Sequence, residues 1–477
     1  MKKFCWILFI GFTLLPFVQT EAKEVQEFQS SFRKEKRNMF ALHPDNPRYF
    51  VFRNRPCVLV TSGEHYGALI NKAFDIDKYL ETLHKDRLNN TRVFIGAYLE
   101  PLNAFNIVDN TLAPSPENYL SPWSRSEQDT SKFDLSKWNS DYFKRLHQLL
   151  KKASKLNIIV ELTLFCPMYD DSQWNISPMN IRNNVNGIGN VRKTNVYTLD
   201  GEKELLQAQE ALVRKIVSEV NKYDNFYFEI CNEPYFGGVT QNWQKRITDV
   251  IVETEKNLAK QHLISVNVAN GTAVVNDPHP AWSIFNFHYC TPPVAISQNS
   301  HLNKPIGMNE TGFRDIYDEY YRREAWAFML SGGALYNNLD YSFTVGKEDG
   351  TNIVTKPTPG GGSPALRKQL GAMKRFIESF NFIKMSPIKE ASSILRSDTK
   401  AVSPYIMSEP GKQYAFYFPK TLKQVELDIP AGTYRIRILD PCTLTEESGT
   451  INHTGGLLKI QIPDIIQNEL VISLIKK

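Results

Sequence analysis

Cysteine is scarce in this sequence, and neither sign of charge dominates it. Six cysteines in 477 residues are too few to frame small domains with disulfides. No Cys-x-x-Cys pair or His/Cys spacing typical of a metal site occurs. The 56 lysines and arginines exceed the 51 aspartates and glutamates by only five. Because no long basic stripe is present either, we expect no nucleic-acid partner.

Long apolar runs are also absent, except at the start of the chain. A short basic beginning precedes the almost wholly apolar run Phe4–Val18, and the small residue Ala22 follows it. This order is that of a secretory signal peptide, residues 1–22. The alternative is a membrane anchor, but the run has about 15 residues and contains Pro16, whereas a spanning helix needs about 20. We therefore expect a secreted or periplasmic protein with no membrane span.

Eight short apolar runs have the character of strands. They are Cys57–Ser62, Thr91–Tyr98, Ile158–Phe165, Phe226–Cys231, Leu263–Val268, Ile284–Tyr289, Pro305–Asn309 and Ala334–Leu339. Most are dense in Val, Ile, Leu and Phe rather than alternating, which is typical of parallel strands that are covered on both faces. Apolar residues at helical spacing lie between several of the runs, as at Phe143, Leu146, Leu149 and Leu150.

Eight strand–helix units predict an α/β fold, a (β/α)8 TIM barrel over residues 40–384. No Gly-rich phosphate-binding turn follows any strand, which disfavours an open dinucleotide-binding sheet. The connections Asn270–Ser283 and Thr291–Lys304 are short enough to hold only a turn or two of helix. Two other connections, Pro101–Asn139 and Pro167–Gly201, are long and follow strands, so they fall at the mouth where barrels bind ligands.

The pattern changes after about residue 385. Val425, Leu427 and Ile429 alternate with polar neighbours, and turns such as Pro430-Ala431-Gly432 interrupt the alternating runs. Period-two alternation between turns predicts a small antiparallel β-sandwich domain over residues 385–477.

Two glutamates stand at the ends of predicted strands. Glu233 follows Asn232 at the end of the fourth strand, and Glu310 ends the seventh. Strands four and seven face each other across the mouth of a barrel, so we expect the two carboxylates to meet although 77 positions (310 − 233) separate them. Glycosidic cleavage uses such a pair about 5–5.5 Å apart, one attacking the anomeric carbon and the other protonating the leaving oxygen. A lone strand-end glutamate has an equally good interpretation as a solvated residue, so the pair carries the argument.

The motif Asn232-Glu233-Pro234 together with Glu310 resembles the clan A retaining glycoside hydrolases, especially the family-five, cellulase-like enzymes. The resemblance implies that Glu233 is the acid/base and Glu310 the nucleophile. It also implies that Asn232 binds the sugar 2-hydroxyl. Arg92, in the second strand, matches the clan arginine that bonds the nucleophile and keeps it ionised.

His288 and Tyr289 match a sixth-strand site whose tyrosine contacts the nucleophile in that clan. The spacing differs from the common pattern, so either residue could make the contact. Family five usually has a histidine at the end of strand three, where this chain has Cys166-Pro167, and a tryptophan at strand eight. Here Tyr336 or Tyr341 is left as the possible sugar platform.

Other residues of the predicted mouth give weaker signals. Glu64 and His65 end the first strand and could bind sugar hydroxyls, or they could be packed and hydrogen-bonded structurally. Trp174, Trp282 and Tyr169 could stack on sugar rings, although ordinary packing is the more common role of a single aromatic residue.

The sequence thus predicts a retaining glycoside hydrolase that cleaves O-glycosidic bonds in an oligo- or polysaccharide by double displacement. This chemistry requires no metal and no organic cofactor. One alternative is a transglycosylase that uses the same residues. The other is a non-catalytic carbohydrate-binding or adhesion protein on a barrel scaffold, which the presence of Glu233, Glu310 and Arg92 disfavours because binding alone needs no carboxylate pair.

Overall fold

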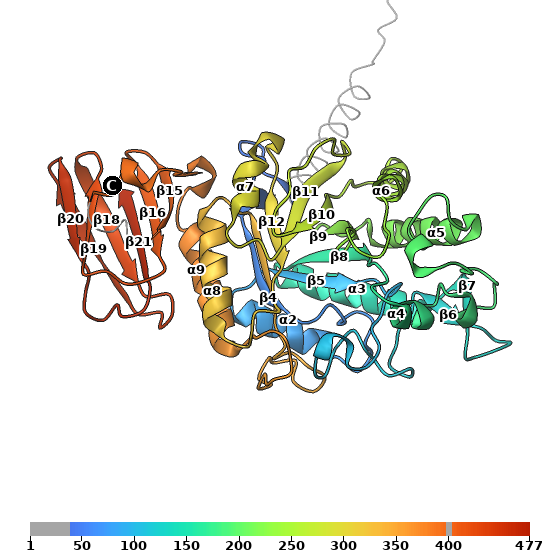
Figure 1. Ribbon diagram of the computed structural model, residues 1–477. Helices are drawn as coiled ribbons and strands as arrows, with labels where there is room; N and C mark the ends of the chain where they lie inside the picture. The colour runs from blue at the N-terminus through green and yellow to red at the C-terminus, as the bar shows by residue number, and fades with distance from the viewer. Residues whose placement is uncertain (1–38, 397–402) are drawn as a thin grey trace, which may run out of the picture.

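The computed structural model describes residues 39–396 and 403–477, so the predicted signal peptide lies outside the described residues. Eight parallel strands form a barrel surrounded by helices (Figure 1). The strands are β4 (Leu59–Gly63), β5 (Asn90–Phe94), β8 (Ile159–Phe165), β9 (Phe226–Cys231), β10 (Ile264–Asn270), β11 (Trp282–His288), β12 (Ile306–Glu310) and β13 (Leu335–Leu339). Their hydrogen-bonded order is β4-β13-β12-β11-β10-β9-β8-β5. This order confirms the predicted (β/α)8 fold.

An asparagine closes the barrel between β4 and β5, the two ends of that order. The backbone N–H of Asn89 donates to the carbonyl of Val60 (3.2 Å). The Asn89 side chain accepts from the N–H of Val60 (3.0 Å) and donates to the carbonyl of Val58 (2.9 Å). One amide side chain therefore supplies hydrogen bonds that a strand ladder would otherwise make.

The helices outside the barrel present apolar stripes to the strands. They are α2 (Ile76–Lys85), α3 (Ser140–Lys155), α5 (Lys203–Val220), α6 (Gln241–Glu255), α7 (Val294–Gln298), α8 (Asp318–Leu330) and α9 (Pro364–Glu378). Phe143, Leu146, Leu149 and Leu150 of α3 are buried, as their spacing predicts. Residues 271–281, all described, contain no helix, and only α7 and a 3-10 turn separate β11 from β12. Both short connections are thus confirmed.

A three-stranded sheet precedes the barrel, which the sequence analysis did not anticipate. It contains β1 (Ala41–Leu42), β2 (Phe50–Phe52) and β3 (Arg55–Cys57). Phe40, just before β1, packs on Phe50 and on Tyr227 of β9, with ring centroids 4.9 and 5.6 Å apart. Its N–H donates to the carbonyl of Asp224, which precedes β9. The small sheet therefore covers the end of the barrel opposite the mouth.

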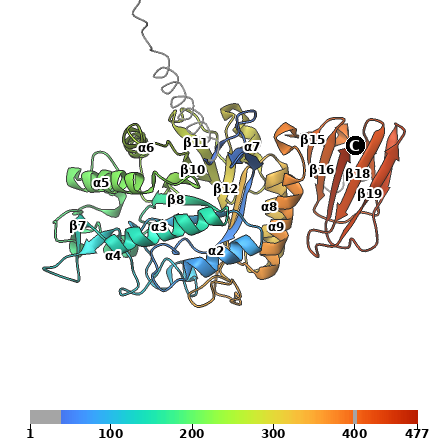
Figure 2. The ribbon, with the colours of Figure 1, turned by 180° about the vertical axis from the view of Figure 1, so that it is seen from behind.

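Two antiparallel sheets follow the barrel (Figure 2). The larger contains β14 (Ser386–Pro387), β15 (Tyr405–Glu409), β16 (Gln413–Phe418), β21 (Leu470–Lys476), β18 (Gly432–Leu439) and β19 (Glu446–His453), in that spatial order; the smaller pairs β17 (Gln424–Asp428) with β20 (Leu457–Gln461). Val425 and Leu427 of β17 are fully buried in one apolar cluster with Phe416 and Ile472 of the larger sheet. The alternation in this part of the sequence therefore does mark the inward face of a sandwich.

The sandwich is fixed to the barrel through α8. The rings of Trp326 in α8 and Tyr417 in β16 stack with centroids 5.6 Å apart. Arg322 of α8 forms a buried ion pair with Glu469 (2.7 Å), which also accepts from the Tyr417 hydroxyl (3.0 Å). Within residues 39–396 and 403–477, no helix combines the length and apolar character that crossing a membrane requires.

Candidate active site

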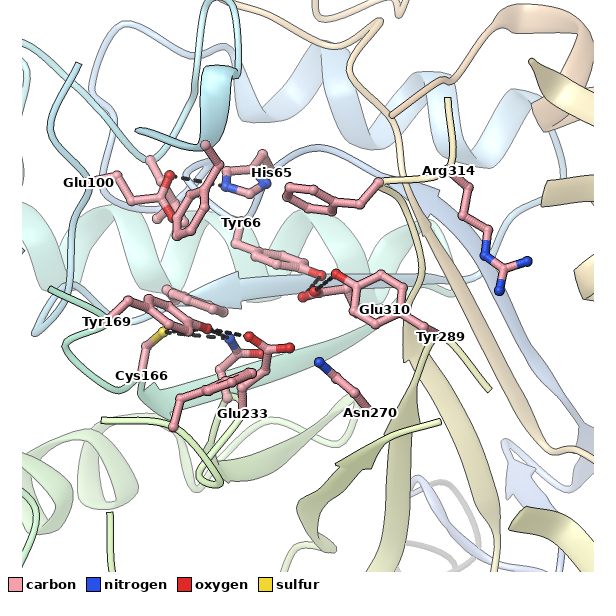
Figure 3. Close-up of a pocket in the computed structure, with 16 residues that line it drawn as sticks. His65, Tyr66, Glu100, Cys166, Tyr169, Glu233, Asn270, Tyr289, Glu310 and Arg314 are labelled. Atoms are coloured by element: carbon pink, nitrogen blue, oxygen red, sulfur yellow. Dashed lines mark hydrogen bonds and ion pairs between the residues drawn. The ribbon is translucent and has the colours of Figure 1, made fainter. Parts of the chain in front are cut away.

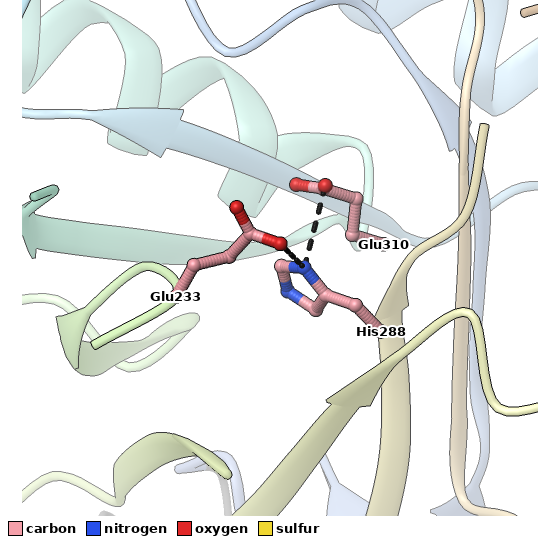
Figure 4. Close-up of side chains that lie close together, drawn as sticks. All are labelled: Glu233, His288 and Glu310. Atoms are coloured by element: carbon pink, nitrogen blue, oxygen red, sulfur yellow. Dashed lines mark hydrogen bonds and ion pairs between the residues drawn. The ribbon is translucent and has the colours of Figure 1, made fainter. Parts of the chain in front are cut away.

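Glu233 and Glu310 lie close together at the mouth of the barrel. Glu310 is the last residue of β12, and Glu233 lies two residues beyond the end of β9. A carboxylate oxygen of each lies within 4.8 Å of the other, and both residues are buried (Figure 4). The structure thus brings together the two side chains that the strand-end positions indicated.

His288 lies between the two carboxylates. Its Nδ1 atom is 3.3 Å from an oxygen of Glu233 and 3.3 Å from an oxygen of Glu310. Burial alone would lower the pKa of His288, but the charges and hydrogen bonds of the two glutamates outweigh it and raise that pKa to about 9. At neutral pH the ring is therefore an imidazolium, which places a positive charge between the two acids.

Glu310 is surrounded by hydrogen-bond donors. The hydroxyl of Tyr289 donates to its Oε1 (2.6 Å), and the hydroxyl of Tyr66 and a guanidinium nitrogen of Arg92 donate to its Oε2 (2.8 and 3.2 Å). Burial would raise the pKa of Glu310, but His288, Arg92 and the Tyr289 hydrogen bond together hold it well below its usual range. Glu310 is therefore an ionised carboxylate aimed into the cavity.

Arg92 is itself held by carboxylates inside the barrel. It donates through Nε to Glu229 (3.0 Å) and through a second nitrogen to the side-chain oxygen of Asn232 (2.6 Å). Glu161 lies further away, 3.9 Å from Nε. Burial, reinforced by the neighbouring Glu229, raises the pKa of Glu161 to about 8 although Arg92 opposes the shift. Glu161 is thus mainly neutral at pH 7, and Glu229 and Glu310 are the acidic side chains that Arg92 contacts directly.

Glu233 has partners different from those of Glu310. The hydroxyl of Tyr169 donates to its Oε2 (2.6 Å), and the hydroxyl of Tyr235 lies 3.3 Å from its Oε1. The amide of Asn232 donates to the Tyr169 hydroxyl (2.9 Å). No arginine or lysine touches Glu233 among the described residues. The two acids therefore differ in environment, as acid/base and nucleophile must.

The backbone is left-handed at three residues of the site. The φ angles are +61° at Tyr66, +35° at Glu233 and +51° at Tyr289. Bulky residues seldom adopt this conformation, which costs energy and recurs at functional sites. Consecutive strand residues normally point to opposite faces, so the turn at Tyr289 explains how both it and His288 face Glu310. The sequence left open which of the two contacts the nucleophile, and in the structure both do.

The two glutamates line a cavity of about 450 Å³ (Figure 3). Its walls come from the ends of β4, β5, β8, β9, β10, β11 and β12 and the loops that follow them. His65 and Glu100 line it on the side away from Glu233, and Phe105 also lines it. Its volume falls within the range of about 300–1,000 Å³ typical of small-ligand sites.

Three residues that were predicted to bind substrate do not line the cavity. Glu64 accepts from the N–H groups of residues 67 and 68 (2.9 and 3.0 Å), so it organises the loop after β4 and does not line the cavity. Trp174 is buried in the short helix α4 (Asp171–Ile176) after β8, and its indole N–H donates to the carbonyl of residue 191 (2.9 Å). Tyr341 packs behind His65, with ring centroids 5.7 Å apart. Tyr341 therefore supports the wall of the cavity rather than forming it.

Sequence reasoning missed several residues of the site. Glu229 and Glu161 were hidden in strands, although a charged residue inside an apolar run was a usable signal because it must point into the barrel interior with partners. Tyr66 follows His65 directly, but only its left-handed backbone turns it toward Glu310. Glu100 and Phe105 belong to a long loop whose sequence has no periodicity that would place them.

The cluster of Glu233, His288 and Glu310 is also the one group of three metal-ligand types found within the described residues. A histidine ligand must be neutral, whereas a pKa of about 9 keeps His288 protonated.

A (β/α)8 barrel with two facing glutamates of unlike environment at its mouth is the architecture of a glycoside hydrolase. The family model "Cellulase (glycosyl hydrolase family 5)" matches residues 71–337, more than half of the chain. The chain belongs to this family. A comparison with curated proteins finds no match.

Solved structures resemble most of the chain. A glycoside hydrolase family 5 protein from Bacteroides vulgatus ATCC 8482 is 11% identical, with a TM-score of 0.62 over 93% of this chain and 94% of that one. A second structure, described as a glycoside hydrolase, is 13% identical, with a TM-score of 0.60 over 93% of this chain and 98% of that one. Identities this low show a shared fold, including the part that follows the barrel.

Proposed function

We propose that this protein is a retaining glycoside hydrolase that cleaves O-glycosidic bonds of an oligo- or polysaccharide by double displacement. The observation that carries the proposal is the spacing: carboxylate oxygens of Glu233 and Glu310 lie within 4.8 Å. Retaining enzymes separate their carboxyl groups by about 5–5.5 Å, whereas inverting enzymes leave about 6.5–9.5 Å for a water molecule. The ionised state of Glu310 supports its assignment as the nucleophile.

In the first step, an oxygen of Glu310 attacks the anomeric carbon while Glu233 transfers its proton to the glycosidic oxygen. The bond from the anomeric carbon to that oxygen breaks, and the leaving sugar departs as an alcohol. Tyr289, Tyr66 and Arg92 hold the attacking carboxylate in place through three hydrogen bonds. The product is an ester between Glu310 and the sugar.

In the second step, Glu233 is a carboxylate and takes a proton from a water molecule. The water oxygen attacks the anomeric carbon, the ester bond breaks, and Glu310 leaves as a carboxylate. Two inversions return the original anomeric configuration. A sugar hydroxyl in place of water would give transglycosylation with the same residues.

The sequence order at residues 1–22 supports a further proposal, that the enzyme is exported to the periplasm or the medium. N-terminal sequencing of the mature protein tests it, and a chain that keeps residues 1–22 in the cytoplasm would contradict it.

Azide rescue separates the two catalytic roles. Glu310→Ala should abolish hydrolysis of an activated aryl glycoside, and azide should restore turnover as a glycosyl azide of inverted configuration, because azide replaces the first inversion. Glu233→Ala should give a glycosyl azide of retained configuration, because azide then attacks the Glu310 ester. Glu447→Ala, an exposed residue of β19, is the matched control and should behave as wild type. Full activity of Glu310→Ala would refute the assignment.

A further inference from the structure

A second polar group lines the cavity on the side away from Glu233, and the mechanism above does not use it. His65 Nε2 lies 3.2 Å from Glu100 Oε2, and both side chains are at least nine-tenths buried. Glu100 also accepts from the hydroxyl of Tyr98 (3.2 Å) and the amide of Asn110 (2.5 Å). Figure 3 shows Glu100 and His65 across the cavity from Glu233 and Asn270.

The ring of His65 keeps one unsatisfied nitrogen. Nδ1 is buried and has no hydrogen-bond partner among the described residues. Burial would lower the pKa of His65, but the neighbouring Glu100 outweighs it and raises that pKa. Because Nε2 is engaged with Glu100, Nδ1 is the ring atom left to donate to or accept from a sugar hydroxyl. A buried polar atom without a partner at a cavity wall is expected to find one on a ligand.

The position of the acid/base shows which part of a substrate reaches this group. Glu233 must lie beside the leaving oxygen, so the departing part of the glycan extends from the Glu233 side of the cavity. The sugar whose anomeric carbon bonds to Glu310 then points the other way, toward His65 and Glu100. Its hydroxyls would meet the carboxyl group of Glu100 and the imidazole ring of His65.

An aromatic contact bridges the mouth of the cavity. Phe105, from the loop after β5, and Phe313, from the loop after β12, lie with ring centroids 6.3 Å apart at 89°. In the barrel order β4 and β13 separate these two strands, so the contact crosses above His65 at the end of β4. Phe105 also packs edge-on against Tyr169, 5.5 Å away. Both phenylalanines have left-handed backbones (φ +54° and +41°), which surrounding contacts must hold.

We propose that the cavity receives only the terminal, non-reducing sugar of a glycan, with Glu100 and His65 binding its hydroxyls, so that the enzyme releases one sugar at a time. This inference rests on the proposed function. In this proposal the contact between Phe105 and Phe313 blocks further sugars on the side of His65 and Glu100. An enzyme that cleaves within chains needs a cleft open at both ends.

The product profile tests the proposal. A panel of 4-nitrophenyl glycosides of both anomers identifies the sugar, and a hexasaccharide of that sugar with a fluorescent label at its reducing end is then digested. The expected early products are the free sugar and a labelled pentasaccharide. Shorter labelled fragments at early times would overturn the inference while leaving the proposed function intact. No hydrolysis of any aryl glycoside, labelled oligosaccharide or polysaccharide would contradict both.

Phe105→Ala should open the closed end, and shorter labelled fragments should then appear among the early products. Leu102→Ala is the matched control: Leu102 is an apolar residue of the same loop, 80% exposed, and it does not line the cavity. This variant should keep the wild-type profile. An unchanged profile for Phe105→Ala would overturn the role of the aromatic contact and with it the closed end.

Glu100→Gln tests hydroxyl binding. Loss of one charged acceptor should lower kcat/KM for the aryl glycoside about 10- to 100-fold, mainly through KM. A deoxy glycoside that lacks the bound hydroxyl should be hydrolysed equally by the wild type and the variant, which a merely structural role would not produce. The measurement is repeated with a set of glycosides that each lack one hydroxyl. If Glu100→Gln lowers kcat/KM by the same factor on every one of them, Glu100 does not bind the sugar.

Discussion

Glu161 provides a sharp test of the charge balance beneath the nucleophile. It is fully buried in β8, and its Oε1 accepts from the amides of Asn286 and Asn309 (both 3.1 Å). Its Oε2 has no partner among the described residues. Glu161→Gln replaces a neutral carboxyl with a neutral amide of the same shape, because the side-chain carbonyl can accept both hydrogen bonds.

The magnitude follows from the pKa of about 8 in the folded protein. An unfolded glutamate titrates near 4.3, so between these values the folded state binds more protons than the unfolded one. The free energy of unfolding therefore falls as pH rises, by about 1.4 kcal/mol per unit through this window. Glu161→Gln lacks this loss. It should match the wild type near pH 4 and exceed it by about 3 kcal/mol at pH 7.

Urea unfolding followed by tryptophan fluorescence between pH 4 and pH 8 measures the free energy of unfolding of the wild type and of Glu161→Gln. Glu447→Gln changes an exposed carboxyl, so its free energy of unfolding should depend on pH as that of the wild type does. Activity of Glu161→Gln at pH 7 should stay close to that of the wild type, because Arg92 keeps its hydrogen bonds to Glu229 and Glu310. A Glu161→Gln protein that is less stable than the wild type at pH 7, with an unchanged pH slope, would refute a neutral Glu161.

The remaining predictions concern other buried charges. Glu229→Gln should cost about 3–5 kcal/mol in urea unfolding and lower kcat/KM, because it removes a carboxylate that holds Arg92; wild-type stability and activity would contradict this role. His288 stabilises the folded state below pH 6.5, and this contribution, about 3 kcal/mol, should be lost as pH rises through about 9. His288→Asn should lack that loss, so an identical pH dependence would argue against the imidazolium. Arg322→Ala should cost about 1–3 kcal/mol in thermal or urea unfolding, because Glu469 loses a charged donor but keeps Arg323 at 3.2 Å; a loss below about 1 kcal/mol would mean that the interface does not depend on the pair.

The barrel could be predicted because its strands are buried on both faces. Such strands are continuous apolar runs, and eight of them leave a strong pattern in the sequence. The meeting of Glu233 and Glu310 followed from strand order alone, since topology sets which strand ends face each other. Strands β1–β3 could not be predicted, because elements of two or three residues are too short to show a period.

The positions of residues in the loops that follow the strands were harder to predict from the sequence. Glu64 follows a strand end, as Glu233 does, but the loop after β4 turns back and its N–H groups capture the Glu64 carboxylate. Glu100 and Phe105 reach the cavity through loop geometry with left-handed residues, which no local pattern encodes. Side-chain direction beyond a strand end depends on the turn, and the turn depends on tertiary contacts.

The anomeric configuration of the first product tests the central claim most directly. Proton NMR during hydrolysis of a defined glycoside resolves the product anomer before mutarotation scrambles it. The spacing of Glu233 and Glu310 predicts that the first-formed sugar keeps the configuration of the substrate. A product that first appears with the opposite configuration would show a single displacement by water and would contradict Glu310 as the nucleophile.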